Sequence, residues 1–220
     1  MRRRRAISRY ANRTVAGRAL ADALLTEAVL GKPVVLALPR GGVPVGAEVA
    51  ARLDAQLGVI LVRKIGVPGR SELAMGALAM VGGEVAEFRN EEIINGLRIN
   101  DQAFEAARNR ELLELKRRAS IFPAADLDIA DATVILVDDG LATGSTMLAA
   151  VAAVRTHAPA AVVVAVPVGA RQAVQALRSL ADRVVCRWSP EPFVAVGGAY
   201  EDFRQLSDEE VLSILKEYSS

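Results

Sequence analysis

The most informative segment of the chain is Val134-Ile135-Leu136-Val137-Asp138-Asp139-Gly140-Leu141-Ala142-Thr143-Gly144-Ser145-Thr146. It begins as an apolar, β-branched run that predicts a buried strand over 133–137. Two adjacent carboxylates follow that strand, and a loop over 138–144 leads into a helix predicted to begin at Ser145. Ligands of open parallel sheets bind beyond the carboxyl ends of the strands, and a helix N-terminus offers free N–H groups to an anion. The stretch therefore predicts an α/β fold with a ligand site at this edge.

A sugar phosphate fits this combination of groups. Its vicinal hydroxyls can donate to Asp138 and Asp139, while its phosphate lies in the loop of Ala142, Thr143, Gly144, Ser145 and Thr146. An exposed Asp-Asp-Gly turn before a capped helix is the competing interpretation, but it leaves the hydroxyl-rich loop unexplained. A Walker loop is excluded because no lysine follows Gly144, and a dinucleotide fingerprint is excluded because the three-glycine spacing is absent.

The rest of the chain continues the alternation of strands and helices. Before the central stretch we predict a strand over 33–38, a Pro39-Arg40-Gly41-Gly42 loop, a helix from Pro44 to about Gln56, and a second strand over 59–62 that stops at Arg63-Lys64. After it we predict a helix over 145–157, a strand over 161–166, a helix over 171–180 and a strand over 183–186. Such an order is typical of parallel strands covered by helices.

Secondary structure can also be predicted for several segments outside this alternation. Leu20, Leu24 and Ala28 indicate a helix that ends at Gly31, and a charged helix is expected over 101–118. The glycine-rich segment 65–84 is predicted to be a loop, with a hairpin of 77–81 and 84–88 across Gly82-Gly83. Ser207-Asp208-Glu209-Glu210 is a capping box that opens the last helix. The late aromatics Trp188, Phe193, Tyr200 and Phe203 either form a lid over a bound base or simply pack together.

Composition excludes several classes of protein. The 220 residues are 52% hydrophobic with a formal net charge of +1, which suits one domain over 1–220 and argues against nucleic acid or membrane as a partner. We place its core at 14–187 and a hood-like tail at 188–220. One Cys and one His allow no disulfide within the chain and no zinc site of three or four Cys or His ligands. Arg2 to Arg5 precede no apolar signal segment, so a cytoplasmic location is expected.

The segment Asp138 to Thr146 resembles the phosphoribosyl pyrophosphate (PRPP) motif of type I phosphoribosyltransferases. Leu38-Pro39-Arg40-Gly41-Gly42 stands where that family has its pyrophosphate loop, and Arg63-Lys64 where it opens its mobile catalytic loop. The resemblance covers nearly the whole chain and is closest to a functionally unassigned bacterial branch, through Arg63 to Gly69, Glu72-Leu73-Ala74 and Phe193 to Gly197.

The resemblance implies a Mg²⁺-dependent displacement at the anomeric carbon of PRPP, in which a nitrogenous acceptor enters and pyrophosphate leaves. Asp138, Asp139, Arg40 and Lys64 are then the expected catalytic residues, and Arg40, Gly41, Gly42, Arg63 and Lys64 the expected pyrophosphate site. Mg²⁺ is expected on PRPP oxygens and water, with Asp138 and Asp139 as candidate ligands. The segment 65–76 is expected to close over the site, and a homodimer is the family's usual assembly.

The sequence departs from the family's pattern at two places, and two other functions are compatible with the same fold. The stretch 164–169 lacks the lysine with which purine-specific relatives recognise the base, so recognition of a 6-oxopurine in that way is not expected. The basic Tyr/Arg/Gly patch that close relatives tend to carry after the long helix is replaced here by the stretch 119–124. A non-catalytic sensor of PRPP or nucleotides on the same fold is the main alternative, and a hydrolase of PRPP or nucleotides is the second. The identity of the acceptor stays open.

Overall fold

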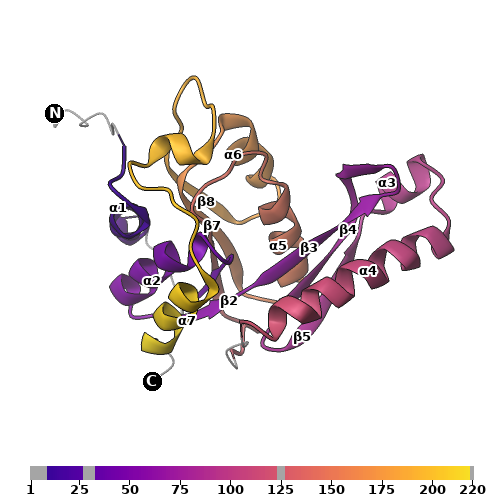
Figure 1. Cartoon of the computed structure of the whole chain (residues 1–220), viewed down its shortest axis with the longest axis horizontal. Coiled ribbons are helices and arrows are strands. Elements are labelled where there is room, and N and C mark those ends of the chain that lie inside the picture. The colour runs from indigo at the N-terminus through magenta and orange to yellow at the C-terminus, as the bar shows by residue number, and fades with distance from the viewer. Residues whose placement is uncertain (1–8, 27–32, 123–126, 219–220) are drawn as a thin grey trace.

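The computed structural model describes residues 9–26, 33–122 and 127–218. Within these ranges the central sheet has five parallel strands in the order β2-β1-β6-β7-β8 (Figure 1). Its strands are β1 (Pro33–Ala37), β2 (Gln56–Val59), β6 (Thr133–Val137), β7 (Ala161–Val168) and β8 (Arg183–Trp188). The predicted fold class, a parallel sheet flanked by helices, is confirmed.

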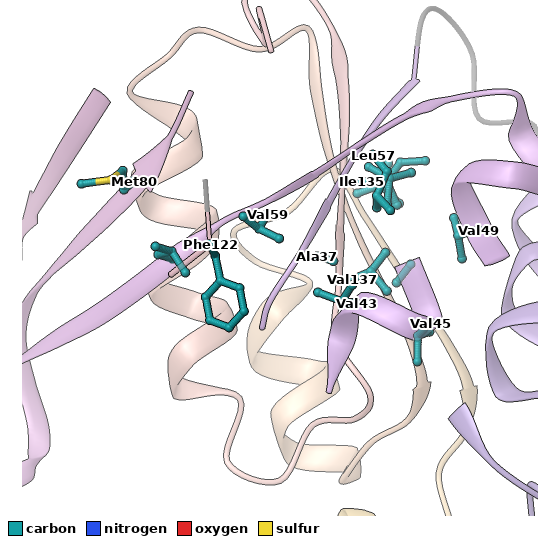
Figure 2. Close-up of a cluster of buried hydrophobic side chains, with 14 of the residues drawn as sticks. Ala37, Val43, Val45, Val49, Leu57, Val59, Met80, Phe122, Ile135 and Val137 are labelled. Carbon is teal, nitrogen blue, oxygen red and sulfur yellow. The ribbon is translucent and has the colours of Figure 1, made fainter. Parts of the chain in front are cut away.

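Side chains of the central strand β6 alternate between two buried layers. Ile135 and Val137 pack in one apolar cluster with α1 (Arg13–Thr26), α2 (Gly42–Leu53) and α7 (Asp208–Glu217). Figure 2 shows part of this layer, with Val43 and Val45 of α2 near Val137. Val134 and Leu136 belong to the other cluster, beneath α5 (Ser145–Arg155) and α6 (Arg171–Leu177). Successive side chains of a strand point to opposite faces, so a strand buried on both faces is apolar throughout.

A second sheet extends from the first as an arm (Figure 1). It is antiparallel and consists of β3 (Leu61–Val67), β4 (Arg70–Val81) and β5 (Glu84–Arg89). Helix α4 (Asp101–Ala119) lies along it, after the short helix α3 (Glu91–Gly96). The predicted hairpin across Gly82-Gly83 and the long charged helix are confirmed.

The predicted second strand over 59–62 is wrong in its boundaries. The apolar run that suggested it spans the junction of two strands, because β2 ends at Val59 and β3 begins at Leu61 in the other sheet. Arg63 and Lys64 therefore lie in the middle of β3, and not at the end of a parallel strand. The helix expected to reach Gln56 ends earlier, at Leu53.

The loop predicted over 65–76 is wrong as well, because these residues form the end of the β3–β4 ladder around a Pro68-Gly69 turn. The register shifts at Gly66, as in a β-bulge. A Cβ on Gly76 would lie 2.7 Å from the carbonyl oxygen of Phe88, so close packing requires this glycine. Gly66 and Gly76 thus lie in strands, whereas Gly69 lies in the turn between them, and residues 66–69 line the cleft described below.

The start of the described chain packs against the segment that follows β8. Tyr10, Ala16, Val168 and Tyr200 form a small buried cluster, which Trp188, Phe193 and Phe203 flank. The late aromatics therefore pack together, as one of the two interpretations predicted. Ala28 and Gly31, at the expected end of the first helix, and Arg2 to Arg5 lie outside the described residues. In the ranges described, no helix combines the length and apolar character that crossing a bilayer requires.

The predicted capping box of α7 is present. The Ser207 hydroxyl accepts from the Glu210 N–H at 3.2 Å, and the Glu210 carboxylate accepts from the Ser207 N–H at 2.9 Å. We expect Ser207→Ala to lower the free energy of unfolding by about 1 kcal/mol in urea denaturation, because the first turn loses this cap. Ser213→Ala, at an exposed position within the same helix, is the control and should change stability little.

Candidate functional site

A cleft of about 950 Å³ lies between the carboxyl edge of the parallel sheet and the arm. The parallel sheet contributes Leu38 and Pro39, which follow β1, and Asp138 and Thr146, which follow β6. The arm contributes side chains of β3 and α4. The lining is Leu38, Pro39, Val62, Arg63, Lys64, Gly66, Val67, Pro68, Gly69, Ala103, Ala106, Ala107, Arg110, Glu111, Arg118, Asp138 and Thr146. Residues far apart in the sequence thus meet at the edge where parallel sheets bind ligands.

The loop predicted to hold a phosphate leads into α5 as expected. Gly144 has a left-handed conformation (φ 75°) that favours glycine, and α5 begins at the next residue. Lys64 reaches this loop from β3, because its Nζ donates to Ser145 Oγ at 3.2 Å. The hydroxyls of Thr143 and Ser145 lie 3.1 Å apart. A cation, two hydroxyls and the N-terminus of α5 therefore converge where an anion is expected.

Asp138 is the carboxylate that the parallel sheet contributes to the cleft, whereas Glu111, which also lines it, is paired with Arg63. Asp138 Oδ1 accepts the backbone N–H of Asp139 at 2.8 Å. Burial raises the pKa of Asp138 well above its ordinary value, and the neighbouring Asp139 raises it further. A partly buried carboxylate gains from a ligand hydroxyl that donates a hydrogen bond to it.

Asp139 faces a different partner. Arg13 Nε donates to its Oδ2 at 2.8 Å, and the side chains of Arg13 and Asp139 are only 11% and 15% exposed. Burial raises the pKa of Asp139, while the hydrogen bond and charge of Arg13 act in the opposite direction. Sequence reasoning missed Arg13, because an arginine at the start of a helix gives no sign of a partner 126 residues away.

The predicted pyrophosphate loop packs against the end of β6. A Cβ on Gly41 would lie 2.0 Å from Asp139 Oδ2, and one on Gly42 would lie 2.7 Å from the carbonyl oxygen of Val137. The absence of a side chain at both glycines thus allows a close approach. The group they approach is the end of β6 and not a ligand. Arg40 Nη1 lies 3.8 Å from Asp208 Oδ1 at the start of α7, and the lining described for the cleft includes Pro39 but not Arg40.

Helix α4, the predicted charged helix, brings charged side chains to the cleft. Arg63 donates twice to Glu111 Oε2, at 2.9 and 2.6 Å, so this arginine is already paired. Arg110 and Arg118 also line the cleft, and their partners are Glu111 and Glu114 of the same helix. Arg110, Glu111 and Arg118 reach the cleft because α4 packs along the second sheet. The charge pattern of the helix alone could not predict this contact with the cleft.

A family model described as "Phosphoribosyl transferase domain" matches residues 7–203. The chain belongs to the phosphoribosyl transferase family. The resemblance carried by 138–146 is thereby confirmed.

The names of two similar proteins agree with this family. The "Putative phosphoribosyl transferase Rv0571c" of Mycobacterium tuberculosis (strain ATCC 25618 / H37Rv) and "Putative phosphoribosyl transferase MT0597" of the CDC 1551 / Oshkosh strain are each 42% identical over 209 residues. These matches cover 94% of this chain but 46% of each relative, so the chain spans about half the length of these proteins. The crystal structure of TT1426 from Thermus thermophilus is 42% identical, with a TM-score of 0.83 over 96% of this chain and 100% of that one.

Proposed function

We propose that this chain is a Mg²⁺-dependent phosphoribosyltransferase that transfers phosphoribose from PRPP to a nitrogenous acceptor and releases pyrophosphate. The observation that supports it most is one cleft lined by Asp138, Lys64 and Thr146, in which Lys64 also reaches the start of α5 through its hydrogen bond to Ser145. The carboxylate suits the ribose hydroxyls, and the loop suits the 5′-phosphate. The cleft extends further under α4, which leaves room for pyrophosphate and an acceptor.

The reaction needs charge stabilisation more than proton transfer. The acceptor nitrogen forms a bond to the anomeric carbon, the bond from that carbon to the pyrophosphate oxygen breaks, and the electron pair leaves with pyrophosphate. The proton of the acceptor nitrogen passes to solvent. Lys64 lines the cleft and, on leaving Ser145, would offer its charge to the leaving group, while the Asp138 carboxylate would lie near the growing positive charge of the ribose. Arg40 could join only by leaving Asp208.

Mg²⁺ fits this site if the substrate supplies most of its ligands. Among the described residues, no group of three or more His, Cys, Asp or Glu side chains could hold a metal. Asp138 can offer a carboxylate in the cleft, and this agrees with an ion that prefers substrate phosphates and water to an all-protein cage. When bound, the ion would neutralise charge on the pyrophosphate.

A pyrophosphate-release screen tests the proposal. The protein is incubated with Mg²⁺ and PRPP, with and without a panel of purines, pyrimidines and other nitrogenous acceptors. Release that depends on one class of acceptor, with a matching ribonucleotide in the products, supports a transferase. Release independent of any acceptor indicates a hydrolase, and PRPP binding without release indicates a sensor. Either result would contradict the proposed transfer.

A further inference from the structure

Strand β3 brings cations to two different parts of the cleft. Lys64 donates to Ser145 at the start of α5, whereas the preceding residue, Arg63, donates to Glu111 of α4. Both residues lie within the strand, where consecutive side chains point to opposite faces. The α4 side of the cleft therefore has cations of its own, apart from the lysine at the loop proposed for the 5′-phosphate.

On that side, the carboxylate of Glu111 is shared by two guanidinium groups. Arg63 Nη2 lies 2.6 Å from its Oε2, and Arg110 Nε lies 3.3 Å from its Oε1. The Glu111 side chain is only 12% exposed, whereas that of Arg110 is 69% exposed. Two positive charges thus meet one negative charge, and Arg110 has the room to turn to a ligand in the cleft that it lines.

Glu114 repeats this arrangement about one turn further along α4. It accepts from Arg117 at 2.8 Å and from Arg118 at 3.2 Å. These two hydrogen bonds lower the pKa of Glu114 to about 2, so that it carries one negative charge at neutral pH. Arg118 belongs to the described lining of the cleft, and Arg117 does not. The four arginines around these two glutamates therefore leave a surplus of two positive charges beside the cleft.

Arg110 and Arg118 can act on one ligand. They are eight residues apart on α4, which is about two turns and roughly 12 Å along the axis, so they lie near the same face of the helix. Exposed ion pairs within one helix contribute little to stability, and a phosphate group can replace the glutamate at little cost. Guanidinium groups also match phosphate oxygens with two parallel hydrogen bonds.

Pyrophosphate is the group of PRPP that still needs such cations. Arg40 of the expected pyrophosphate loop lies 3.8 Å from Asp208 and does not belong to the described lining of the cleft. Gly41 and Gly42 of the same loop approach the end of β6. Pyrophosphate carries more negative charge than Lys64 alone can balance.

We propose that Arg110 and Arg118 bind the pyrophosphate group of PRPP and stabilise it as it leaves, exchanging Glu111 and Glu114 for its phosphate oxygens. This inference rests on the proposed function, because it assigns the leaving group to residues of the same cleft. When the bond from the anomeric carbon to the pyrophosphate oxygen breaks, its electron pair stays on that oxygen. The two guanidinium groups meet the added charge without a proton transfer.

The test compares three ligands by calorimetry in the presence of Mg²⁺: PRPP, inorganic pyrophosphate, and ribose 5-phosphate, which lacks the leaving group. Arg110→Gln and Arg118→Gln should each weaken PRPP and pyrophosphate about tenfold, because each removes a charge-assisted contact to phosphate. The double variant should weaken both ligands further, while ribose 5-phosphate should bind within about twofold of the parent. Higher salt should weaken pyrophosphate binding more steeply in the parent than in the double variant.

Arg117→Gln is the matched control, because it removes a cation from the same helix and the same glutamate outside the described lining. It should leave all three affinities within about twofold of the parent, and all these exposed positions should tolerate glutamine without loss of folding.

Four results would contradict the account in different ways. Unchanged pyrophosphate affinity in the double variant would overturn the inference, as would a loss shared equally by ribose 5-phosphate. An equal loss in Arg117→Gln would show a general effect of charge and would also overturn it. A folded parent that binds neither PRPP nor ribose 5-phosphate would instead overturn the proposed function.

Discussion

Asparagine in place of Asp138 is expected to lower the rate of pyrophosphate release by about 100-fold or more, because the cleft loses the carboxylate that we propose to bind the ribose. The same variant should be more stable than the parent at pH 7. Burial and the neighbouring Asp139 raise the pKa of Asp138 in the folded chain, so keeping this group ionised costs folding free energy. Asparagine keeps the shape and an acceptor for the Asp139 N–H without the charge.

The sign of the pH dependence follows from this raised pKa. Below the ordinary aspartate pKa the carboxyl is protonated in both the folded and the unfolded chain, and the variant has no advantage from this group. As pH rises from there through the raised pKa of the folded chain, the parent loses stability relative to Asp138→Asn. Urea denaturation of both proteins between about pH 4 and pH 8 should show a difference that grows with pH. Asp22→Asn, at an exposed carboxylate on α1, is the control, and a variant less stable than the parent at pH 7 would contradict the burial of a costly charge.

Gly41→Ala is expected to lower the free energy of unfolding by about 3 kcal/mol. The new methyl group would lie 2.0 Å from Asp139 Oδ2 and 2.6 Å from Cγ, so the carboxylate must move and the buried pair with Arg13 must break. The affinity for Mg²⁺·PRPP should fall as well, since the turn is displaced. Urea denaturation and calorimetry measure the two effects.

Gly96→Ala is the matched control for this substitution. A Cβ there meets no atom within 4 Å, and the position lies at the end of α3, away from the cleft lining. This variant should be as stable as the parent or slightly more so, because alanine has the lower conformational entropy when unfolded. Equal stability of Gly41→Ala and the parent would show that Asp139 has room to move and that the buried pair contributes little.

The central part of the fold could be predicted because its signals are local. The strand over 133–137 is apolar at nearly every position, two acidic residues end it, and α5 begins at Ser145 as expected. The capping box of α7 is equally local, since Ser207 and Glu210 need only each other. Periodicity and capping depend on residues within a few positions, and sequence displays these directly.

The arm and the Arg13–Asp139 ion pair could not be predicted because they depend on contacts between distant residues. Backbone hydrogen bonds form the β3–β4 ladder whatever the side chains, so Gly66 and Gly76 suggested a loop where the chain is a strand. The apolar run 59–62 carries no mark of a change from one sheet to another at Ile60. Arg13 gains its role only when the first helix, the end of β6 and the tail meet.

The most direct test of this account is a calorimetric titration of Mg²⁺·PRPP into the parent protein and into Asp138→Asn. We expect saturable binding with one site per chain in the parent, competition by ribose 5-phosphate, and an affinity at least about 100-fold lower in the variant. Binding of equal strength in both would show that PRPP is held elsewhere. No binding to a folded parent would contradict the sugar-phosphate site itself.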